Sequence, residues 1–399
     1  MRRAGTHSIA ASENIITKMI VGILKEIKAE ENRVSMTPFG VDALVRRGHC
    51  VLVENGAGAA SGFDNEAYIG AGAEIVDTPA EIFGRSDMIM HVKEIMPPEY
   101  KLLREGQIVF TYLHLAADEI QTRALMASGC VAIAYETIQT PDGRLPLLQP
   151  MSEVAGRMSV QEGAKYLEMI HGGRGMLLGG VPGVEPARVL VLGGGAVGAN
   201  AAKMACGLGA DVTLLDTNLE RLRYLADVMP ANCKLRMSSP LLVRELVREA
   251  DLVIGAVLLP GARAPRLVTR DMLATMKRGS VLVDVAIDQG GCFETSIATK
   301  HSDPVFIVDG VVHYCVGNMP GAVARTSTMA LTNATLPFAI KLADKGWERA
   351  LAEDPALARG LNVCHGEITY PSVAEAWGLP VRQRTVPSGP APALPFQAA

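Results

Sequence analysis

Short runs of apolar residues recur along the chain and alternate with segments whose apolar residues follow a helical spacing. In the first part of the chain, these runs predict buried strands at 20–24, 50–54, 88–91, 108–111 and 130–134. Helices are expected between them, with starts near Pro38, Asp64, Pro79, Pro98 and Asp118. Because continuous apolar runs alternate with helices, we expect a parallel sheet that is covered on both faces.

The same alternation returns in the second part of the chain. Further strands are predicted at 252–257, 281–285 and 305–308. A long helix at 153–169 is expected to link the two open α/β units. After Met319 the pattern is helical again, at 326–345 and 355–359, and we expect this segment to cross back and pack on the first unit.

A glycine-rich turn between two apolar strands is the most informative feature of the chain. A strand at 189–192 ends in the pattern GxGxxG, which Gly193, Gly195 and Gly198 form, and a helix of small residues follows. A second strand ends at Asp216, 18 positions after Gly198. This strand–turn–helix–strand context indicates a dinucleotide-binding fingerprint, and the alternative is a glycine-rich turn without a ligand.

Each position of the fingerprint has a mechanical reason. Gly193 allows the tight turn, Gly195 lets the backbone approach a pyrophosphate, and Gly198 lets the helix lie close to the strand. The pyrophosphate would sit on N–H groups at the helix start, where the helix dipole favours negative charge. Asp216 can accept both ribose hydroxyls and would repel a 2′-phosphate, so the sequence predicts NAD rather than NADP.

The composition agrees with a large two-domain protein and excludes several kinds of partner. Of the 399 residues, 49% are hydrophobic and 20% are charged, which is enough apolar material for substantial cores. The net charge of −4 gives no basic excess to suggest nucleic acid or an anionic membrane, and no apolar run reaches the roughly 18 residues of a membrane span. The seven cysteines are scattered without a CxxC pair, which favours a cytoplasmic protein with reduced thiols and no zinc site.

The two ends of the chain lack the pattern of the rest. Residues 1–18 have no long apolar core, so we interpret them as an N-terminal extension or an upstream in-frame start, not as a signal peptide. The tail at 380–399 is rich in Pro, Ala and Ser and is expected to be flexible. A substrate domain is then predicted at 19–150 and 320–379, and a nucleotide-binding domain at 151–319.

Four polar residues follow predicted strands, at the edge where ligands bind in open α/β sheets. They are Arg33, Lys93, His114 and Asp288. Each has an ordinary alternative: a solvated arginine, a surface lysine paired with Glu94, a core or capping histidine, and a turn aspartate. Together they suit hydride transfer on a small carboxylate substrate, because the cations can hold the carboxylate and histidine can move a proton near neutral pH.

Longer phrases around these residues occur in a fixed order. They are Lys93-Glu94, Tyr112-Leu113-His114-Leu115-Ala116, Ala134-Tyr135-Glu136-Thr137, Pro150 to Arg157, Gly180-Val181-Pro182-Gly183-Val184, Asp284 to Gly291, Asn318-Met319-Pro320 and Thr332-Asn333-Ala334-Thr335. From about Met19 to about Leu379, the chain resembles the L-alanine dehydrogenase family, which groups with the pyridine nucleotide transhydrogenases. The resemblance implies an α/β fold of two Rossmann-like, doubly wound parallel-sheet domains with an interdomain cleft, assembled as a homo-hexamer. It also implies the reversible, NAD-dependent oxidation of L-alanine to pyruvate, ammonium and NADH.

The resemblance further implies roles for individual residues. The substrate would be bound by Arg33, Lys93 and Asn318. The acid/base pair would be His114 and Asp288. The cofactor would lie against Ser152, Gly193, Gly195, Ala196, Val197, Gly198, Asp216, Arg221, Ser238, Val257, Leu258, Val285, Asp288 and Met319. No metal is expected, except that Glu136 is a magnesium contact in some relatives.

This interpretation has a definite chemistry and two alternatives. Hydride would leave Cα of alanine for the nicotinamide, water would add to the iminium carbon, and Asp288 or His114 would take the proton. One alternative is the soluble nucleotide-binding component of a proton-translocating transhydrogenase, which would need a membrane partner. The other is a non-catalytic NAD-binding protein. The polar set that includes Lys93 argues against the former, and the His114–Asp288 pair argues against the latter.

Overall fold

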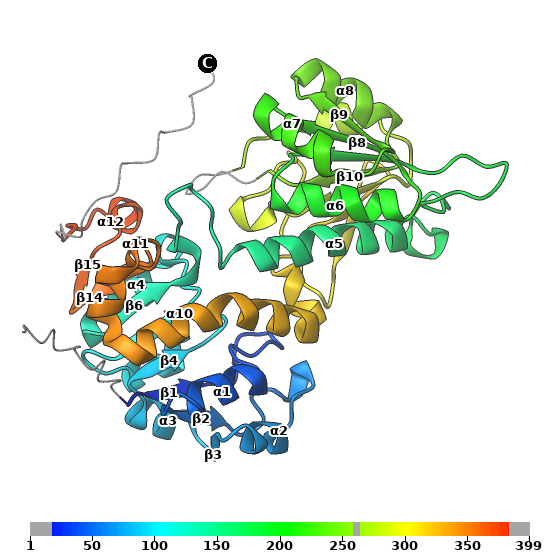
Figure 1. Cartoon of the computed structure of the whole chain (residues 1–399). Helices are drawn as coiled ribbons and strands as arrows, with labels where there is room; N and C mark the ends of the chain where they lie inside the picture. The colour runs from blue at the N-terminus through cyan, green and yellow to red at the C-terminus, as the bar shows by residue number, and fades with distance from the viewer. Residues whose placement is uncertain (1–17, 258–263, 383–399) are drawn as a thin grey trace, which may run out of the picture.

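The computed structural model describes residues 18–257 and 264–382, and it contains two β-sheets that helices cover (Figure 1). The first sheet lies in the blue, cyan and red-orange parts of the chain, and the second lies in the green and yellow part. Predictions for residues 1–17, for Leu258 and for the tail beyond residue 382 fall outside the described residues. Within those residues, no helix is long and apolar enough to cross a membrane.

The first sheet has eight strands in the order β15-β14-β6-β5-β4-β1-β2-β3. Its strands are β1 (Ile20–Ile23), β2 (Cys50–Glu54), β3 (Glu74–Val76), β4 (Met88–Met90), β5 (Ile108–Thr111), β6 (Val131–Ala134), β14 (Leu361–Cys364) and β15 (Glu367–Ile368). The five strands predicted for this part of the chain are all present, and β1 to β6 pair in parallel. The expectation of an entirely parallel sheet is wrong at one edge, where β14 runs antiparallel to β6 and β15.

Four α-helices of the first unit begin at side chains that cap them. These helices are α1 (Pro38–Val45), α2 (Asn65–Gly70), α3 (Pro79–Arg85) and α4 (Glu119–Ser128). The caps, which each accept a hydrogen bond from a backbone N–H of the first turn, are Thr37, Asp64, Thr78 and Asp118. The segment near Pro98 is not an α-helix but the 3₁₀-helix η2 (Pro97–Leu102), whose two leading prolines supply no N–H groups.

The second sheet has seven strands in the order β12-β13-β11-β10-β7-β8-β9. Its strands are β7 (Arg188–Leu192), β8 (Asp211–Asp216), β9 (Cys233–Met237), β10 (Leu252–Gly255), β11 (Val281–Asp284), β12 (Val305–Val308) and β13 (Val311–Tyr314). The run β9-β8-β7-β10-β11-β13 has the strand order 3-2-1-4-5-6 of a dinucleotide-binding sheet. Here too the parallel expectation is wrong at one edge, because β12 and β13 form an antiparallel hairpin.

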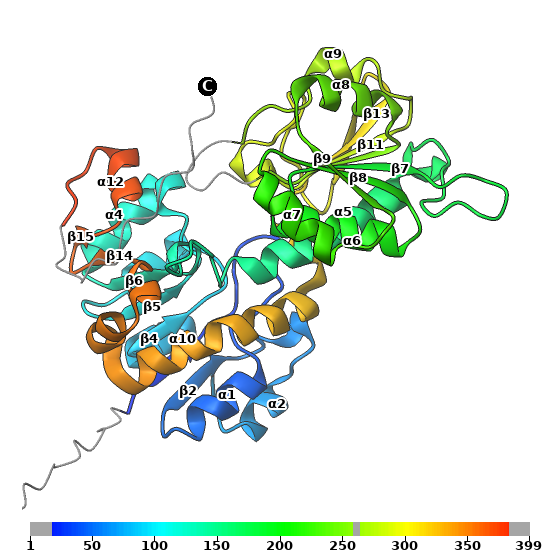
Figure 2. The same cartoon turned by 45° about the horizontal axis from the view of Figure 1, so that its top comes forward.

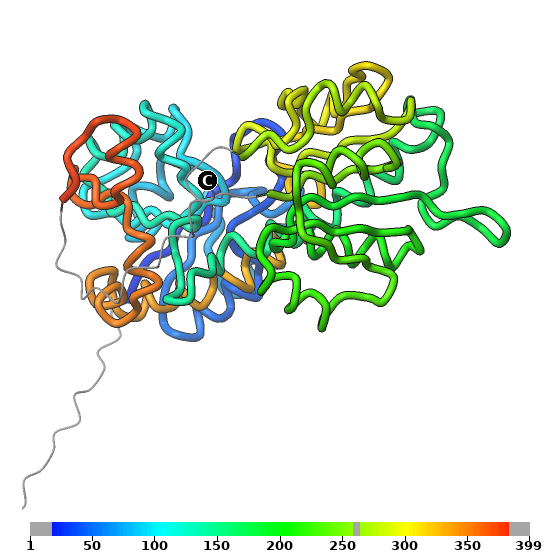
Figure 3. Tube along the Cα trace, turned by 90° about the horizontal axis from the view of Figure 1, so that it is seen from above, coloured from blue at the N-terminus to red at the C-terminus, as the bar shows by residue number. Residues whose placement is uncertain are grey.

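Helices cover the second sheet and connect it to the first (Figures 2 and 3). The helices of the second unit are α6 (Ala196–Gly207), α7 (Leu219–Val228), α8 (Pro240–Glu249) and α9 (Arg270–Leu273). The predicted linking helix is α5 (Gln149–Tyr166), which packs against α6 and against α10 (Ala324–Glu353). α10 then packs on α1, and α11 (Pro355–Ala358), β14 and α12 (Pro371–Trp377) complete the first unit. The expected return of the chain to the first sheet is therefore confirmed.

Candidate active site

The glycines of the fingerprint have the backbone geometry that the sequence predicts. Gly193 directly follows β7 with φ +100°, a conformation that side chains rarely allow. A Cβ at Gly198 would lie 1.8 Å from the carbonyl oxygen of Gly193, so only glycine lets α6 approach β7 this closely. Gly195 is the N-cap of α6, and a Cβ there would meet no atom within 4 Å. The start of α6 is therefore open to a ligand.

The carboxylate of Asp216 ends β8 and faces this turn. Its two oxygens accept hydrogen bonds from the backbone N–H groups of Gly194 and Asn218, both at 2.7 Å. Arg221 donates from Nε to the carbonyl oxygen of Gly194 at 2.6 Å, so it supports the same turn from the other side. Ser238 follows the neighbouring strand β9, and its N–H donates to the carbonyl oxygen of Asp216 at 2.9 Å. The predicted cofactor residues Asp216, Arg221 and Ser238 are thus brought together beside the glycine turn.

The strands on the other side of β7 bring further predicted residues to the same edge. A Cβ at Gly193 would lie 3.2 Å from Cγ2 of Val257, which follows β10. Val285 follows β11, and Asp288 lies in the 3₁₀-helix η6 (Ile287–Gln289). The buried carboxylate of Asp284 holds this loop, because it accepts hydrogen bonds from three backbone N–H groups and a serine hydroxyl. Burial raises the pKa of Asp284, against the opposing effect of these hydrogen bonds.

Helix α5 lies against the start of α6 through a glycine contact. A Cβ at Gly156 would lie 2.2 Å from the carbonyl oxygen of Val197, so α5 and α6 are in backbone contact there. Ser152 precedes Gly156 by four residues and therefore lies one turn away on the same face of α5. Ala196 and Val197 form the first turn of α6. The α5 residue that was predicted to contact the cofactor is thus close to the fingerprint helix.

Arg33 is buried and fully paired, so the alternative of a solvated arginine is wrong. Its Nε and Nη2 atoms donate to the two carboxylate oxygens of Glu31 at 2.7 and 2.5 Å, and Nη2 also donates to Asn318 Oδ1 at 2.7 Å. Nη1 lies 3.0 Å from the sulfur of Met151. Burial alone would raise the pKa of Glu31, but the hydrogen bonds and charge of Arg33 outweigh it and lower the pKa to about 2. Arg33 and Glu31 therefore form a buried ion pair.

Lys93 follows β4 and has no anionic partner of its own. Its Nζ makes no hydrogen bond or ion pair with any described residue, and Glu94 pairs instead with Lys28 at 2.8 Å. The predicted alternative of a Lys93–Glu94 surface pair is therefore wrong. Burial and the positive charge of Arg33 lower the pKa of Lys93, while the charges of Glu94 and Asp288 oppose that shift. A half-buried ammonium that lies beside a guanidinium and forms no ion pair with a described residue is suited to bind an anion.

His114 lies at the carboxyl end of β5, in the left-handed backbone conformation with φ 51° and ψ 37°. Its side chain is 42% exposed and makes no capping hydrogen bond, so it is neither a core nor a capping histidine. The imidazole stacks on the ring of Tyr112, with the ring centroids 6.0 Å apart. His114 also lines a hollow of about 380 Å³ together with Lys28, Glu94 and Tyr100. The hydrogen bonds and ion pairs of the described residues do not join His114 to Asp288.

The two units are connected beside Arg33 by Asn318, which the family resemblance assigns to the substrate, and by residues with no predicted role. Asn318, with φ 58°, donates from Nδ2 to Glu31 at 2.9 Å. Glu30, with φ 60°, accepts hydrogen bonds from the N–H groups of His301 and Ser302 at 3.0 and 3.1 Å. The ring of His301 in turn contacts the carbonyl oxygen of Asn318 at 3.2 Å. Two sequence signals pointed to this region: the resemblance that assigned Asn318 to the substrate, and the acidic pair Glu30-Glu31 shortly before Arg33.

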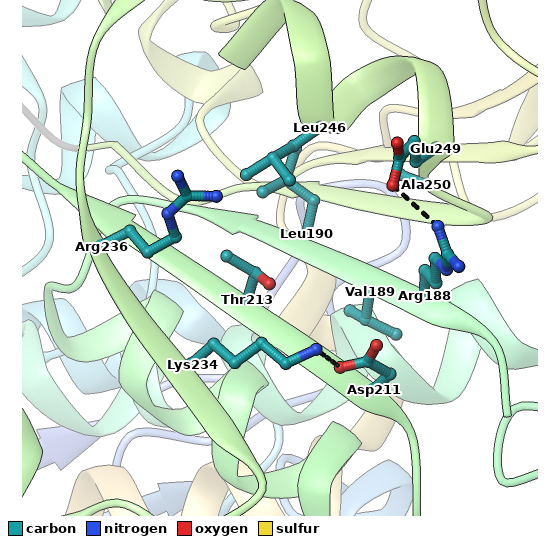
Figure 4. Close-up of a pocket in the computed structure, with 10 residues that line it drawn as sticks. All are labelled: Arg188, Val189, Leu190, Asp211, Thr213, Lys234, Arg236, Leu246, Glu249 and Ala250. Carbon is teal, nitrogen blue, oxygen red and sulfur yellow. Dashed lines mark hydrogen bonds and ion pairs between the residues drawn. The ribbon is translucent and has the colours of Figure 1, made fainter. Parts of the chain in front are cut away.

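A second hollow, of about 300 Å³, lies at the opposite edge of the second sheet (Figure 4). It is lined by residues at the amino ends of β7 to β9, where Lys234 pairs with Asp211 at 2.5 Å and Arg188 pairs with Glu249 at 2.7 Å. Ligands of open α/β sheets bind at the carboxyl ends of the strands. This hollow is therefore separate from the candidate site.

Comparison with known protein families accounts for nearly the whole chain. Residues 22–155 match the family described as "Alanine dehydrogenase/PNT, N-terminal domain", and residues 159–371 match "Alanine dehydrogenase/PNT, C-terminal domain". This chain belongs to the alanine dehydrogenase/PNT family. The predicted family is therefore confirmed, and membership in it makes the chain similar to proteins that use pyridine nucleotides.

Similar proteins of this family match over most of their own length. The alanine dehydrogenase of Halomonas elongata is 58% identical over 361 residues, which cover 90% of this chain and 97% of the relative. The alanine dehydrogenase of Bacillus subtilis is 56% identical, over 90% of this chain and 95% of the relative.

Two solved structures give the same picture for the fold of this family member. A structure of L-alanine dehydrogenase has a TM-score of 0.88 at 51% identity, and the match covers 90% of this chain and 99% of that one. A transhydrogenase from Sinorhizobium meliloti has a TM-score of 0.77 at 27% identity, over 88% of this chain and 100% of that one. The predicted class, two Rossmann-like α/β units, is confirmed apart from the antiparallel edge strands.

Proposed function

We propose that this member of the alanine dehydrogenase/PNT family catalyses the reversible oxidative deamination of L-alanine with NAD, giving pyruvate, ammonium and NADH. The observation that carries the proposal is the half-buried ammonium of Lys93, which is close to the charge of Arg33 and forms no ion pair with any described residue. A substrate carboxylate would supply the missing negative charge. The high identity to proteins named alanine dehydrogenase supports the same conclusion.

In this proposal, Lys93 and Arg33 hold and orient the substrate. The guanidinium is fixed by Glu31, so Arg33 offers little freedom, whereas the unpaired Nζ of Lys93 can reach the carboxylate or the keto oxygen. Asn318 contacts both Arg33 and Glu31 and would close this side of the site. Fixed geometry of this kind lowers the activation free energy of a reaction between two bound molecules by several kcal/mol. The reason is that their translational and rotational entropy is already lost on binding.

The proton transfers fall to His114 and Asp288. When bound, the nicotinamide ring would take the hydride from Cα of alanine. Water must then add to the same carbon, Cα, after it has lost the hydride. His114 or Asp288 would accept a proton from this water and later donate a proton to the leaving amine. His114 is partly exposed at the end of β5, and Asp288 acts electrostatically on Lys93 from the loop after β11. Each side chain would thus approach the substrate from a different sheet.

The proposal also covers the cofactor, the domains and the assembly. Asp216, which faces the fingerprint turn, would bind the adenosine ribose and select NAD over NADP. We place the substrate domain at 19–150 and 320–379 and the nucleotide domain at 151–319, because α5 and α10 begin close to these limits. A cytoplasmic hexamer is part of the proposal by family resemblance, and the lack of any disulfide among the seven cysteines, all of them in described residues, agrees with a reducing compartment.

One assay tests the proposal against its main alternative. The purified chain alone should oxidise NADH in the presence of pyruvate and ammonium, and the reaction should stop when either is omitted. The similarity to a transhydrogenase structure favours the alternative of a nucleotide-binding component, which would not turn over these substrates without a partner. A panel of 2-oxo acids in the same assay would define the substrate range, and no oxidation with any of them would contradict the proposal.

A further inference from the structure

We propose that Glu136 is a positioning residue that holds His114 in place for proton transfer, and that it is not a magnesium ligand. The proposal rests on the function proposed above, in which His114 is an acid/base group. It gives Glu136 a role other than the magnesium contact that the corresponding residue makes in some relatives.

The topology brings Glu136 and His114 to one edge of the first sheet. Glu136 lies in the 3₁₀-helix η4 (Tyr135–Thr137), directly after β6, and His114 follows the parallel neighbour β5. One carboxylate oxygen of Glu136 accepts a hydrogen bond from the N–H of His114 at 2.6 Å. The N–H of Leu113 lies 3.2 Å from both carboxylate oxygens. The side chain of Glu136 therefore binds the backbone that carries the histidine.

This backbone needs an external support. His114 has φ 51° and ψ 37°, a left-handed conformation that residues other than glycine adopt uncommonly. The peptide before it is also held from the opposite side, because Gln121 donates from Nε2 to the carbonyl oxygen of Leu113 at 2.8 Å. Two side chains from different elements thus fix the direction in which His114 leaves the strand.

The carboxylate also faces the ring of His114. The Nδ1 atom lies 4.0 Å from Oε1 of Glu136, and the ring stacks on Tyr112. Tyr112 is itself fixed, since its hydroxyl donates to the carbonyl oxygen of Leu147 at 2.6 Å. With Nδ1 turned toward the carboxylate, Nε2 remains free to face the substrate as a proton donor or acceptor.

The same contacts argue against a metal ion on Glu136. Two backbone N–H groups point their positive ends at the carboxylate, and a cation would have to compete with them. In the part of the chain that the structure describes, no group of three or more His, Cys, Asp or Glu side chains could hold a metal ion. The carboxylate of Glu136 is therefore already used as a hydrogen-bond acceptor, and a cation would have to displace these bonds.

The test compares Glu136→Gln and Glu136→Asp with the control Glu119→Gln. Glu119 is an exposed carboxylate at the start of α4 that pairs with Arg123, so its variant removes the same charge near the same loop without touching His114. We expect Glu136→Gln to lower kcat by about tenfold or more with a pyruvate KM within about twofold, because the acid/base group is displaced but substrate binding is kept. Glu136→Asp should recover part of the loss, and the control should match the wild type.

Two further measurements separate positioning from a purely structural role. In a His114→Ala background, Glu136→Gln should lower kcat little further, because Glu136 acts through the imidazole of His114. Deuterium uptake at the amides of Leu113 and His114 should rise in Glu136→Gln while the melting temperature changes little, because a single acceptor oxygen then remains for two N–H groups.

The outcomes decide between the alternatives. An unchanged kcat in Glu136→Gln, or a full additional loss in the His114→Ala background, would overturn the proposal. So would activation of the wild type by millimolar MgCl2, with reversal by EDTA, that Glu136→Gln abolishes. If Glu136→Gln does not fold, the kcat and the deuterium uptake of Glu136→Asp carry the test. Failure of the proposed function would look different, because the wild type itself would then not turn over pyruvate and ammonium.

Discussion

Asn318 donates a hydrogen bond to Glu31 at 2.9 Å, and this contact joins the loop after β13 to the loop after β1. Glu31 is at the same time the counterion of the buried Arg33. One carboxylate therefore fixes a candidate substrate-binding cation and connects the two sheets. Because Arg33 is buried, the ion pair cannot be broken without leaving a charge uncompensated.

The first prediction concerns Glu31→Gln. Removing the charge should lower the free energy of unfolding at neutral pH by about 3 kcal/mol, because Arg33 loses its buried partner. It should also weaken pyruvate binding, since Arg33 would no longer be held. Urea unfolding and the pyruvate KM measure these effects. Wild-type stability in the variant would show that the pair contributes nothing.

The pH dependence of the same variant gives an independent check. The pKa of Glu31 is lowered from 4.5 to about 2, so its contribution is present above pH 4.5 and is lost as the pH falls toward 2. A shift of this size corresponds to about 3 kcal/mol. The stability difference between wild type and Glu31→Gln should therefore shrink between pH 4.5 and pH 2. A difference that stays constant over this range would contradict the assignment.

The strands that the sequence revealed are those with continuous apolar runs, and the strands it did not reveal lack such runs. Strands β4, β5 and β6 are buried at every position, which is why their sequences read as uninterrupted apolar segments. Strand β9 is mostly exposed and alternates polar with apolar residues, and β3 has only three residues. Strand β12 was predicted at 305–308, but its hairpin partner β13 was not, although Asp309 and Gly310, both with positive φ, form the Asp-Gly pair typical of such turns.

Individual residues of the candidate site could be predicted from the sequence, but the hydrogen bonds and ion pairs between them could not. Arg33, Lys93 and His114 could be identified because each follows a strand, and strand ends are where ligands bind. The partner of Arg33 could not, since Asn318 is 285 positions away and reaches it only through the packing of two sheets. Glu136 was noted as a metal contact by resemblance, whereas its hydrogen bonds to the His114 loop depend on the pairing of β5 with β6.

A second prediction concerns His91, which is buried between two carboxylates. Its Nδ1 lies 3.1 Å from Glu26 and its Nε2 lies 3.1 Å from Glu99. Burial alone would lower the pKa of His91, but the two charges and their hydrogen bonds raise it from 6.5 to about 10. The raised pKa contributes stability that is complete below pH 6.5 and is lost as the pH rises through about 10.

The variant that checks this prediction is His91→Gln. It should be less stable than the wild type at pH 7, because two buried carboxylates would lose the cation between them. The difference should become smaller as the pH is raised toward 10, where the wild-type imidazolium loses its proton. Urea midpoints at several pH values give the comparison, and a gap that does not narrow would show that His91 is neutral in the native protein.

A third prediction concerns Asp216 and cofactor choice. The wild type should prefer NADH over NADPH by at least about tenfold, which corresponds to roughly 1.4 kcal/mol, because the carboxylate would face the 2′-phosphate as a like charge. Asp216→Ala and Asp216→Ser should narrow this preference. The ratio of kcat/KM for the two cofactors measures it, and equal values in the wild type would refute the role of Asp216.

The structure adds a control for this experiment. Asp216 also accepts the N–H of Gly194, so Asp216→Ala removes both a charge and a support of the fingerprint turn. Asp216→Asn keeps an acceptor oxygen and removes only the charge. If charge repulsion sets the preference for NADH over NADPH, Asp216→Asn should reduce this preference as much as Asp216→Ala does. Asp216→Asn should nevertheless bind NADH more tightly than Asp216→Ala.

The last prediction is that replacement of His114 and replacement of Lys93 change different kinetic constants. A general acid/base contributes about 10²–10⁴ to rate, mostly in kcat, so His114→Ala should lower turnover steeply while NADH binds with near-normal affinity. Lys93→Ala should raise the pyruvate KM as well, because the unpaired ammonium would bind the substrate before and during reaction. Lys93→Arg should not restore the wild-type value, because a planar fork replaces a point donor in a half-buried position.

Both variants should fold, because both side chains lie after strands rather than within them. NADH affinity measured by fluorescence is the control, since it depends on the fingerprint from Gly193 to Asp216, which neither substitution touches. A His114→Ala enzyme that keeps more than about a tenth of the wild-type kcat would exceed the activity expected after loss of an acid/base group. In that case Asp288 would be the general acid/base, and the hydrogen bonds of Glu136 to the His114 loop would have a structural role only.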